Sequence, residues 1–277
     1  MADEPLIPSE LPRRINAERI LLLGWTRAVL LQLAHPLIAA GVADHSTFRG
    51  STVAAFSRLH HTVLAMLAMT FGDDGERERA LEAIRAIHRR VHGTLPAACG
   101  RFPAGTRYSA EDPALLLWVH VTLIDSILLV YERLVAPLTD AERDRYCVDS
   151  ADVAIALGAR AGDVPRCRRE LQACLDREYG AGSIAVSDQA RDLAAALLSP
   201  VSSRAAAPLT AVATFLAAGL LPAQVRREYG FAWSPRRERA FGMTLRVLRA
   251  TGRLLPRRVT WWPQARRWSA SVKRPGG

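Results

Sequence analysis

The chain has 277 residues and 49% of them are apolar, so it is long enough to bury a sizeable core. The apolar residues are mostly Ala and Leu, which favour helices, and no run alternates as a half-buried strand would. The net charge of +10 comes almost entirely from arginine, and the four cysteines form no CxxC pair, which excludes a disulfide scaffold and predicts free thiols in a reducing cytosol.

The N-terminus and two apolar segments bear on localisation. The chain opens with Met-Ala-Asp-Glu-Pro, which is acidic and has no apolar core, so we expect no signal peptide and a cytoplasmic protein. Residues 20–43 and 114–138 are apolar enough to raise the question of a membrane span. Both segments carry ionisable groups, which are costly inside a bilayer, so buried helices of a globular bundle are favoured.

The first hundred residues predict three helices after a Pro-rich arm over residues 1–13. The first helix is expected over 16–43, with a kink at Pro36 directly after His35, because proline removes a backbone donor. A second helix is expected over 51–71, ending at Gly72, and a third over 74–91, with Gly93 as its stop. A loop rich in Pro and Gly follows over 94–109.

The remaining residues predict further helices. Asp112-Pro113 begins a long helix that ends near Pro137, since proline is favoured at the first helical position. Thr139 and Glu142 form a capping box for the next helix, which stops at Gly158. Helices are also expected at 164–178, 187–198, 204–220 and 235–254, and the tail from residue 257 is expected to be irregular.

These elements predict an all-α, single-domain bundle of about eight to ten helices. The expected organisation is an extended N-terminal arm over 1–13, a helical domain over 14–255, and a basic tail over 256–277. The tail contains three tryptophans set among arginines. Positive charge clusters late in the chain, at the arginines 226, 227, 236, 237, 239, 253, 257, 258, 266 and 267. A cluster of positive charge favours anionic partners in general.

The histidines are the most informative residues, since all seven lie within the first 120 positions: 35, 45, 60, 61, 88, 92 and 120. Histidine is the commonest metal ligand in proteins. His88 shares one face of the third predicted helix with four apolar residues: Leu81, Ile84, Val91 and Leu95. A neutral imidazole in an apolar wall is what a proximal haem ligand needs. The alternative is a core histidine bonded to a backbone carbonyl.

The second predicted helix is apolar around most of its circumference, yet it carries Arg58, His61 and Thr62. Arg58 and Thr62 are four residues apart and share a face. A buried arginine must be paired. Its partner is a haem propionate, a substrate anion or, in a purely structural interpretation, Asp44 or Asp125.

Three other histidines are candidate pocket residues. His120 lies on an apolar stripe of the long helix, where a polar core network and a pocket wall are equally good interpretations, and His35 is similar. His45 is expected in a loop, where functional residues concentrate. The motifs ExxH, HExxH, CxxCH, GxxxxGK[ST] and GxSxG are absent. Buried histidines in a helical protein without an acid-rich metal cage favour haem.

Several segments in fixed order carry a family resemblance: LQLAHPLIAAGVADHSTF (31–48), RLHHT (58–62), FG (71–72), RAIHRRVHG (85–93), DPALLLWVHVTLIDS (112–126), YE (131–132) and PLTDAERDRY (137–146). Together they resemble the MpaB-type oxygenase family, whose catalytic domain is shared with the latex-clearing rubber oxygenases. The resemblance covers about residues 13 to 250 and implies an all-helical fold that holds a non-covalent haem b.

The resemblance also implies roles for particular residues. In the rubber oxygenases a histidine in an Arg-x-x-His stretch binds the iron, and here that histidine is His88, preceded by Arg85. An Arg-x-x-x-Thr pair lines the distal side, and Arg58 and Thr62 fit it. The rubber enzymes place a lysine before the threonine, where this chain has His61. That imidazole could coordinate the iron as a sixth ligand or hydrogen-bond dioxygen. The rubber enzymes are also secreted, which this chain is not expected to be.

The leading hypothesis is a haem b-dependent oxygenase that acts with dioxygen on a small, apolar, unsaturated substrate and has no nucleic-acid partner. Its candidate residues are Arg58, His61 and Thr62 for catalysis, His88 for the iron, and Arg85, His35, His45 and His120 for the cofactor pocket. One alternative is a non-catalytic haem sensor or carrier, with His61 on the iron. A second is a helical scaffold whose basic tail, with Trp261, Trp262 and Trp268, binds an anionic membrane surface.

Overall fold

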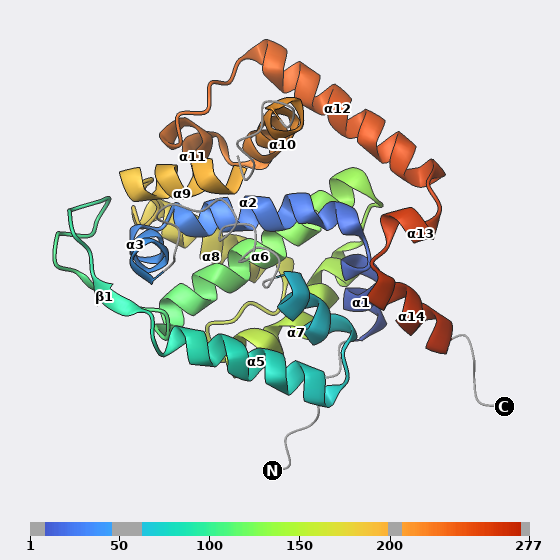
Figure 1. Cartoon of the computed structure of the whole chain (residues 1–277), viewed down its shortest axis with the longest axis horizontal. Helices are drawn as coiled ribbons and strands as arrows, with labels where there is room; N and C mark the ends of the chain where they lie inside the picture. Colours follow the sequence, from blue (N-terminus) through green and yellow to red (C-terminus); the bar gives the residue numbers. More distant parts are fainter. Residues whose placement is uncertain (1–8, 46–62, 199–206, 273–277) are drawn as a thin grey trace.

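A long apolar helix, α6 (Pro113–Leu134), lies at the centre of the fold, with α2 (Leu22–Leu33) packed along it (Figure 1). The computed structural model describes residues 9–45, 63–198 and 207–272. As predicted, α6 begins at Pro113, and the Asp112 side chain caps it by accepting a hydrogen bond from Ala114 N at 2.8 Å. Gly24 permits the close contact with α2, because a Cβ atom there would lie 2.9 Å from Ser126 O.

The segment predicted as one kinked helix over 16–43 is divided into separate elements. They are α1 (Glu10–Asn16), a short 3₁₀ helix (Arg19–Leu21), α2 and α3 (Pro36–His45). The chain turns by 100° between α2 and α3, at His35. Pro36 has no backbone N–H and opens the new helix, so the expected kink is a complete break. The arm expected to be extended through residue 13 is helical from Glu10 onward.

Of the second predicted helix, the structure describes residues 63–71, which are helical. The third is α5 (Asp74–His88), and a capping box between Asp73 and Glu76 fixes its start. The loop after it contains a short antiparallel pair that was not predicted, β1 (His92–Thr94) with β2 (Arg107–Ser109), in which Gly93 pairs with Tyr108.

The later helices follow the sequence closely. The capping box of Thr139 and Glu142 is confirmed at the start of α7 (Asp140–Ala156), and Gly158 follows with a φ of 113°. Next come α8 (Arg168–Gly180), α9 (Asp188–Leu198), α10 (Ala207–Leu220) and α12 (Pro235–Leu254). A short helix, α11 (Ala223–Glu228), was not predicted.

The C-terminal tail contains two helices, α13 (Arg257–Thr260) and α14 (Pro263–Val272), so the expectation of an irregular tail is wrong. Trp262 N donates to Ala17 O at 3.0 Å, and the Trp262 ring stacks on Trp25 at 6.2 Å. Trp261 Nε1 donates to Glu18 Oε1 at 2.8 Å. These contacts bring the tail against α1 and α2, where Figure 1 shows α14 beside α1. Aromatic burial, rather than local propensity, orders this segment.

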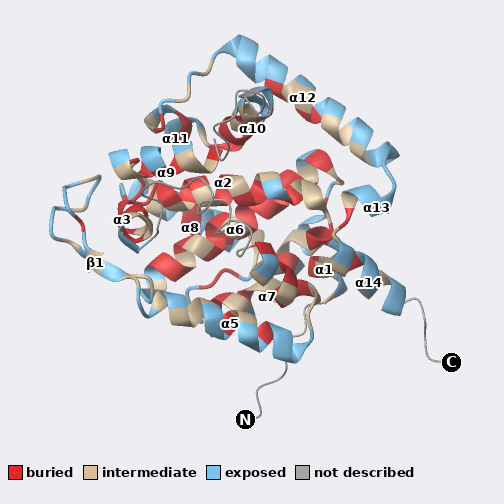
Figure 2. Ribbon diagram, in the orientation of Figure 1, coloured by how far each residue is buried: buried red, intermediate tan, exposed pale blue. Residues whose placement is uncertain are grey.

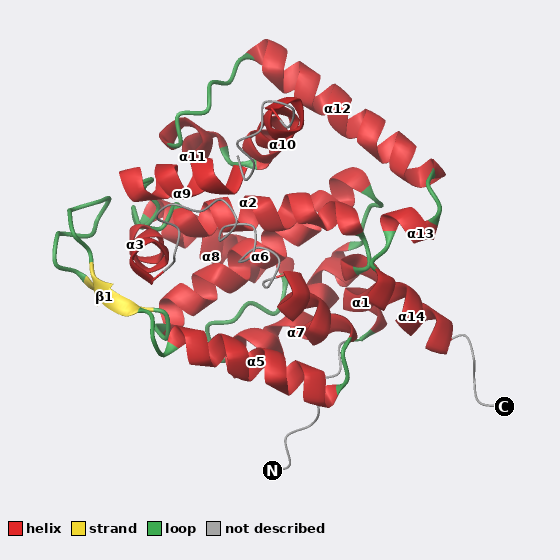
Figure 3. Cartoon of the chain, in the orientation of Figure 1, coloured by secondary structure: helices red, strands yellow, loops and turns green. Residues whose placement is uncertain are grey.

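The core follows α2 and α6, as Figure 2 shows, and Figure 3 shows that most of the elements around it are helices. The fold is therefore a single all-α domain, as predicted. In the described ranges α6 is long and apolar enough to span a membrane, and the bent pair of Arg19–Leu33 with Pro36–His45 would also qualify if it were one span. Because 72% of the apolar window of α6 is buried inside the protein, a core helix accounts for it.

Candidate functional site

His88 is the last residue of α5 and is half-buried. The turn before it is fixed by Arg85, whose Nε donates to Ala156 O, the last carbonyl of α7, at 3.0 Å. The chain just beyond it touches α3, because a Cβ atom at Gly41 would lie 3.2 Å from Val91 Cγ1. The iron-ligand candidate therefore stands between α3 and the C-terminal end of α7. The apolar stripe expected around it is buried at its two ends, Leu81 and Leu95, and half-buried between them.

Arg85 connects the end of α5 to α7. Besides its bond to α7, its guanidinium pairs with Glu78 at 3.0 Å and with Glu82 at 3.7 Å, both on its own helix. Its side chain keeps 33% of its surface exposed. An arginine held by two carboxylates and a carbonyl orients the helix end that carries His88.

His35 occupies the bend between α2 and α3 and is buried. Its ring lies 5.1 Å from the ring of Phe102, and its Nδ1 atom has no hydrogen-bond partner among the described residues. Burial, reinforced by the charge of Arg101, lowers the pKa of His35 to about 4. The imidazole is therefore neutral at pH 7.

His120 lies in the middle of α6 and is also buried. Burial, together with the nearby charge of Arg166, lowers its pKa to about 4, and its Nε2 atom likewise has no hydrogen-bond partner within the described ranges. One turn earlier, Leu116 clusters with Ala154 and Ala159 at the end of α7. The stripe of α6 that carries His120 thus faces the C-terminal end of α7, where Arg85 also binds.

His45 ends α3 and is exposed, so it lies in a helix rather than in the expected loop. Its Nε2 atom lies 2.9 Å from His92 O, and its ring is 6.5 Å from that of Tyr108. The Tyr108 hydroxyl donates to Asp44 Oδ2 at 2.6 Å, and burial followed by this bond raises the pKa of Tyr108. The hairpin is thereby locked onto the end of α3, beside the segment that follows His88.

A buried ion pair that the sequence did not predict crosses between α2 and α6. Arg27 NH1 lies 2.8 Å from Asp125 Oδ2 and 2.6 Å from Ser126 Oγ, while its Nε donates to Leu220 O at 2.8 Å. Arg168 also binds Asp125, at 2.8 Å. The only sequence signal was an arginine and an aspartate within two apolar runs. Among the described residues Asp125 therefore pairs with two arginines, Arg27 and Arg168.

The other predicted residues fall outside the described ranges. Arg58, His61 and Thr62 lie within residues 46–62, so their predicted roles stay predictions. Across the described parts of the chain, no group of three or more His, Cys, Asp or Glu residues is placed to hold a metal ion. A haem needs fewer protein ligands than a bare metal ion, since one neutral imidazole from the protein can hold its iron. The neutral, buried imidazoles of His35 and His120 fit the interior such a group needs.

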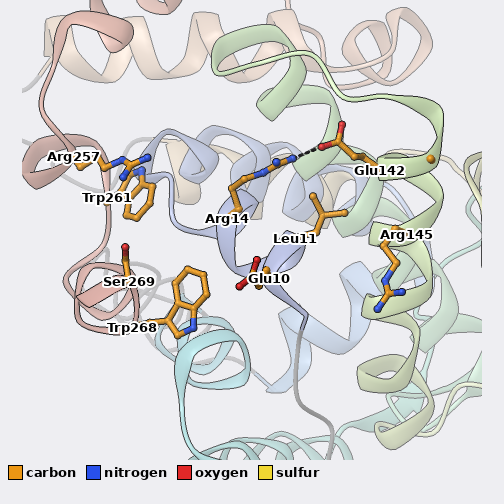
Figure 4. A pocket seen from close by; sticks show the side chains of 10 residues that line it. Glu10, Leu11, Arg14, Glu142, Arg145, Arg257, Trp261, Trp268 and Ser269 are labelled. Carbon is orange, nitrogen blue, oxygen red and sulfur yellow. Dashed lines mark hydrogen bonds and ion pairs between the residues drawn. The ribbon is translucent and has the colours of Figure 1, made fainter. Parts of the chain in front are cut away.

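A cavity of about 520 Å³ lies elsewhere, between α1, the start of α7 and the C-terminal helices (Figure 4). Its lining residues are Glu10, Leu11, Arg14, Ala141, Glu142, Arg145, Arg257, Trp261, Trp268 and Ser269. Its cations are already engaged: Arg14 by Glu142 at 2.5 Å, Arg145 by Asp149 at 2.7 Å, and Arg257 by the Trp261 ring at 4.4 Å. None of the described haem-site candidates lines it, and its three arginines face two carboxylates, those of Glu10 and Glu142.

Residues 13–251 match the family described as "ER-bound oxygenase mpaB/B'/Rubber oxygenase, catalytic domain". Two mycobacterial proteins are 29% identical to the chain over 235 residues, which covers 83% of this chain and 88% of theirs. They are named "Uncharacterized protein Mb2261", from Mycobacterium bovis, and "Uncharacterized protein Rv2237", from Mycobacterium tuberculosis. No solved structure matches the chain.

Proposed function

This chain belongs to the family of the mpaB/B' and rubber oxygenase catalytic domains, and on that premise we propose that it is a haem b-dependent oxygenase acting on a small, apolar, unsaturated substrate. The observation that carries the proposal is the family match over residues 13–251, which takes in every predicted site residue. Bound haem would supply the dioxygen chemistry that no side chain offers.

His88 would hold the iron. It is the histidine of the Arg-x-x-His stretch, and its place at the end of α5 leaves the imidazole at a junction of helices rather than on an open face. Metal ligation requires a neutral imidazole whose ring orientation is fixed. The contacts of Arg85 with α7 and of Val91 with Gly41 fix the backbone on both sides of His88.

Arg85 acts as a positioning residue. Its guanidinium is held by Ala156 O and by the carboxylates of Glu78 and Glu82, so its contribution is to anchor the last turn of α5. In Arg85→Ala we expect haem to bind more weakly and the Soret maximum to shift, because the ligand loses its fixed orientation. A change in overall stability alone, with an unchanged spectrum in the folded fraction, would contradict this role.

His35 and His120 would contribute neutral donors or acceptors to the interior. Both stay uncharged at pH 7, because burial lowers their pKa values to about 4. Neutral polar groups in an apolar surround admit an apolar substrate at lower cost than charged groups would. His45 and the Asp44–Tyr108 bond would close the hairpin side of the pocket.

Arg58, His61 and Thr62 are proposed for the distal side. Arg58 would hold a propionate or a substrate anion, since a guanidinium binds a carboxylate through two parallel hydrogen bonds. Thr62 and His61 would donate hydrogen bonds toward dioxygen. His61 in place of the lysine of the rubber enzymes predicts a distal side of different basicity.

Turnover tests the oxygenase proposal. The haem-loaded protein is incubated with squalene, as an apolar unsaturated probe, under ¹⁸O₂, and the products are examined by mass spectrometry. We expect ¹⁸O in a carbonyl or hydroxyl product, a loss of at least about tenfold in Arg58→Gln, and retention in His92→Ala. His92 is exposed on β1 and serves as the matched histidine control.

A stoichiometric haem complex that consumes no dioxygen with squalene or with polyunsaturated acyl esters would favour the second candidate, a haem sensor or carrier. In that case the spectrum of the reduced protein should be six-coordinate and should become five-coordinate in His61→Ala. A five-coordinate wild type would exclude His61 as the sixth ligand.

A further inference from the structure

Helix α12 is apolar on two opposite faces. Its inward face carries Phe241 and Leu245, which are buried against the core, and half-buried Leu248. Its outward face carries Met243, Val247, Ala250 and Leu254, spaced four, three and four residues apart, so they form one stripe along the helix. Packing against α6 and α10 accounts for the inward face alone.

The outward stripe is exposed over most of its length. Met243 keeps 60% of its surface accessible, Val247 55% and Leu254 85%, and the stripe continues into the exposed Leu255 and Val259. Figure 2 shows α12 as a largely exposed helix at the edge of the molecule. Exposed apolar side chains grouped on one face commonly mark a contact surface.

A row of arginines runs beside the stripe. Arg239, Arg246 and Arg253 are spaced by seven residues, which places them on one side of the apolar stripe, and all three are exposed. Residues 235–272 contain ten arginines and one acidic residue, Glu238, so this segment carries a net charge of +9 out of the +10 of the whole chain. Helix α12, which carries the stripe, has six of these arginines and Glu238, so its own net charge is +5.

The tryptophans of the tail contact the body of the protein and are not part of the exposed stripe. Trp261 bonds Glu18, Trp262 stacks on Trp25, and Trp268 packs near Phe71 at 6.3 Å and under Arg13 at 5.5 Å. They hold α13 and α14 against the body of the protein. The surface with both apolar and cationic groups available is thus α12 with the residues just after it.

We propose that the outward face of α12 docks the protein on an anionic lipid bilayer, as a peripheral contact. An amphipathic helix lying in the interface buries apolar side chains among the acyl chains while arginines bind anionic headgroups. Both requirements are met by the Met243–Leu254 stripe and the arginine row. This inference does not depend on the proposed oxygenase activity.

The charge argues against two other occupants. A second copy of the chain would bring two segments of net charge +9 together, and like charges at close range oppose association. A nucleic acid would use the arginines but would gain little from Met243, Val247 and Leu254, because phosphate contacts supply its affinity. An anionic bilayer uses the charge and the apolar stripe together.

The test is co-sedimentation of the full chain with vesicles. Binding is measured to phosphatidylcholine vesicles with and without phosphatidylserine, and we expect binding to the anionic vesicles to be at least about tenfold tighter. Replacing the arginine row, Arg239→Gln/Arg246→Gln/Arg253→Gln, should weaken it about 100-fold, since each arginine near an anionic surface contributes roughly a factor of five.

Matched variants separate the docking surface from general charge and hydropathy. The triple variant Arg79→Gln/Arg160→Gln/Arg169→Gln removes three exposed arginines from α5, the turn after α7, and α8, and should bind as the wild type does. Val247→Ser should weaken binding about fivefold, whereas Val148→Ser, a 39% exposed valine on α7, should not. Circular dichroism establishes that each variant is folded.

Three results would overturn the proposal. The first is equal binding to neutral and anionic vesicles, or no binding to either. The second is loss of binding in the control triple variant as large as in the α12 triple variant. The third is a concentration-dependent dimer, or binding to a DNA duplex, that is lost in the α12 variants while vesicle binding is unaffected.

Discussion

Helices α6 and α12 are in contact and nearly equal in length, with 22 and 20 residues, but they use their apolar residues in opposite ways. In α6 most of the apolar residues are buried, with an ion pair and a neutral histidine enclosed among its neighbours. In α12 arginines dominate, yet Met243, Val247 and Leu254 remain exposed. The more apolar of the two helices is thus a core element, and the more polar one carries the proposed docking surface. Hydropathy alone does not distinguish these two uses; the placement of charge around the apolar residues does.

The enclosed ion pair of α6 is expected to give the largest effect on stability. Asp125→Asn removes the charge that balances buried Arg27, and an uncompensated buried charge costs about 3 to 5 kcal/mol. Asp188→Asn, whose carboxylate is exposed and pairs with Arg191, should leave the free energy of unfolding nearly unchanged. Urea denaturation measures both. Equal effects of the two substitutions would show that the α6 pair adds nothing to the fold.

The two faces of α12 should differ in the same experiment. Phe241→Ala opens a cavity next to Phe215 and Trp233 and should cost about 3 kcal/mol or more. Met243→Ala, on the outward face, should change stability by less than about 0.5 kcal/mol. If Met243→Ala destabilised the chain as much as Phe241→Ala, the outward stripe would belong to the core and not to a docking surface.

Acidification should weaken the protein through its neutral histidines. The pKa of His120 falls from 6.5 to about 4 on folding, so between these values the unfolded chain binds the additional proton. The contribution of His120 to the free energy of unfolding is therefore fully present above pH 6.5. It is lost as the pH falls toward 4, and the loss amounts to about 3 kcal/mol. In His120→Gln the loss between pH 7 and pH 4 should be smaller by that amount. His92→Gln, at an exposed position, should follow the wild type, and identical curves for all three proteins would contradict the assignment.

The sequence predicted most of the elements that local signals determine. The Asp112-Pro113 start of α6, the Thr139–Glu142 capping box and the position of α12 are each encoded within a few residues, and each is confirmed. The helical structure of the tail, α13 and α14, was not predicted. It depends on the packing of Trp261 and Trp262 on α1 and α2, which lie more than two hundred residues away in the chain. Distant aromatic contacts leave no local pattern.

The candidate site was predictable to a similar extent. Its residues could be proposed from the histidine distribution and the family resemblance, but the contacts that position them could not. The bond from Arg85 to Ala156 O and that from Tyr108 to Asp44 join segments 71 and 64 residues apart. The Arg27–Asp125 pair was likewise hidden, since a charge within an apolar run does not reveal its partner.

Haem binding through His88 is tested by the absorption spectrum of the protein from haem-replete cells, measured beside those of His88→Ala and His92→Ala. We expect a Soret band in the wild type and in His92→Ala, and its loss or a strong shift in His88→Ala, because His88 would hold the iron. A wild type without a Soret band after haem is added would contradict haem binding, and a His88→Ala spectrum identical to that of the wild type would contradict His88 as the iron ligand.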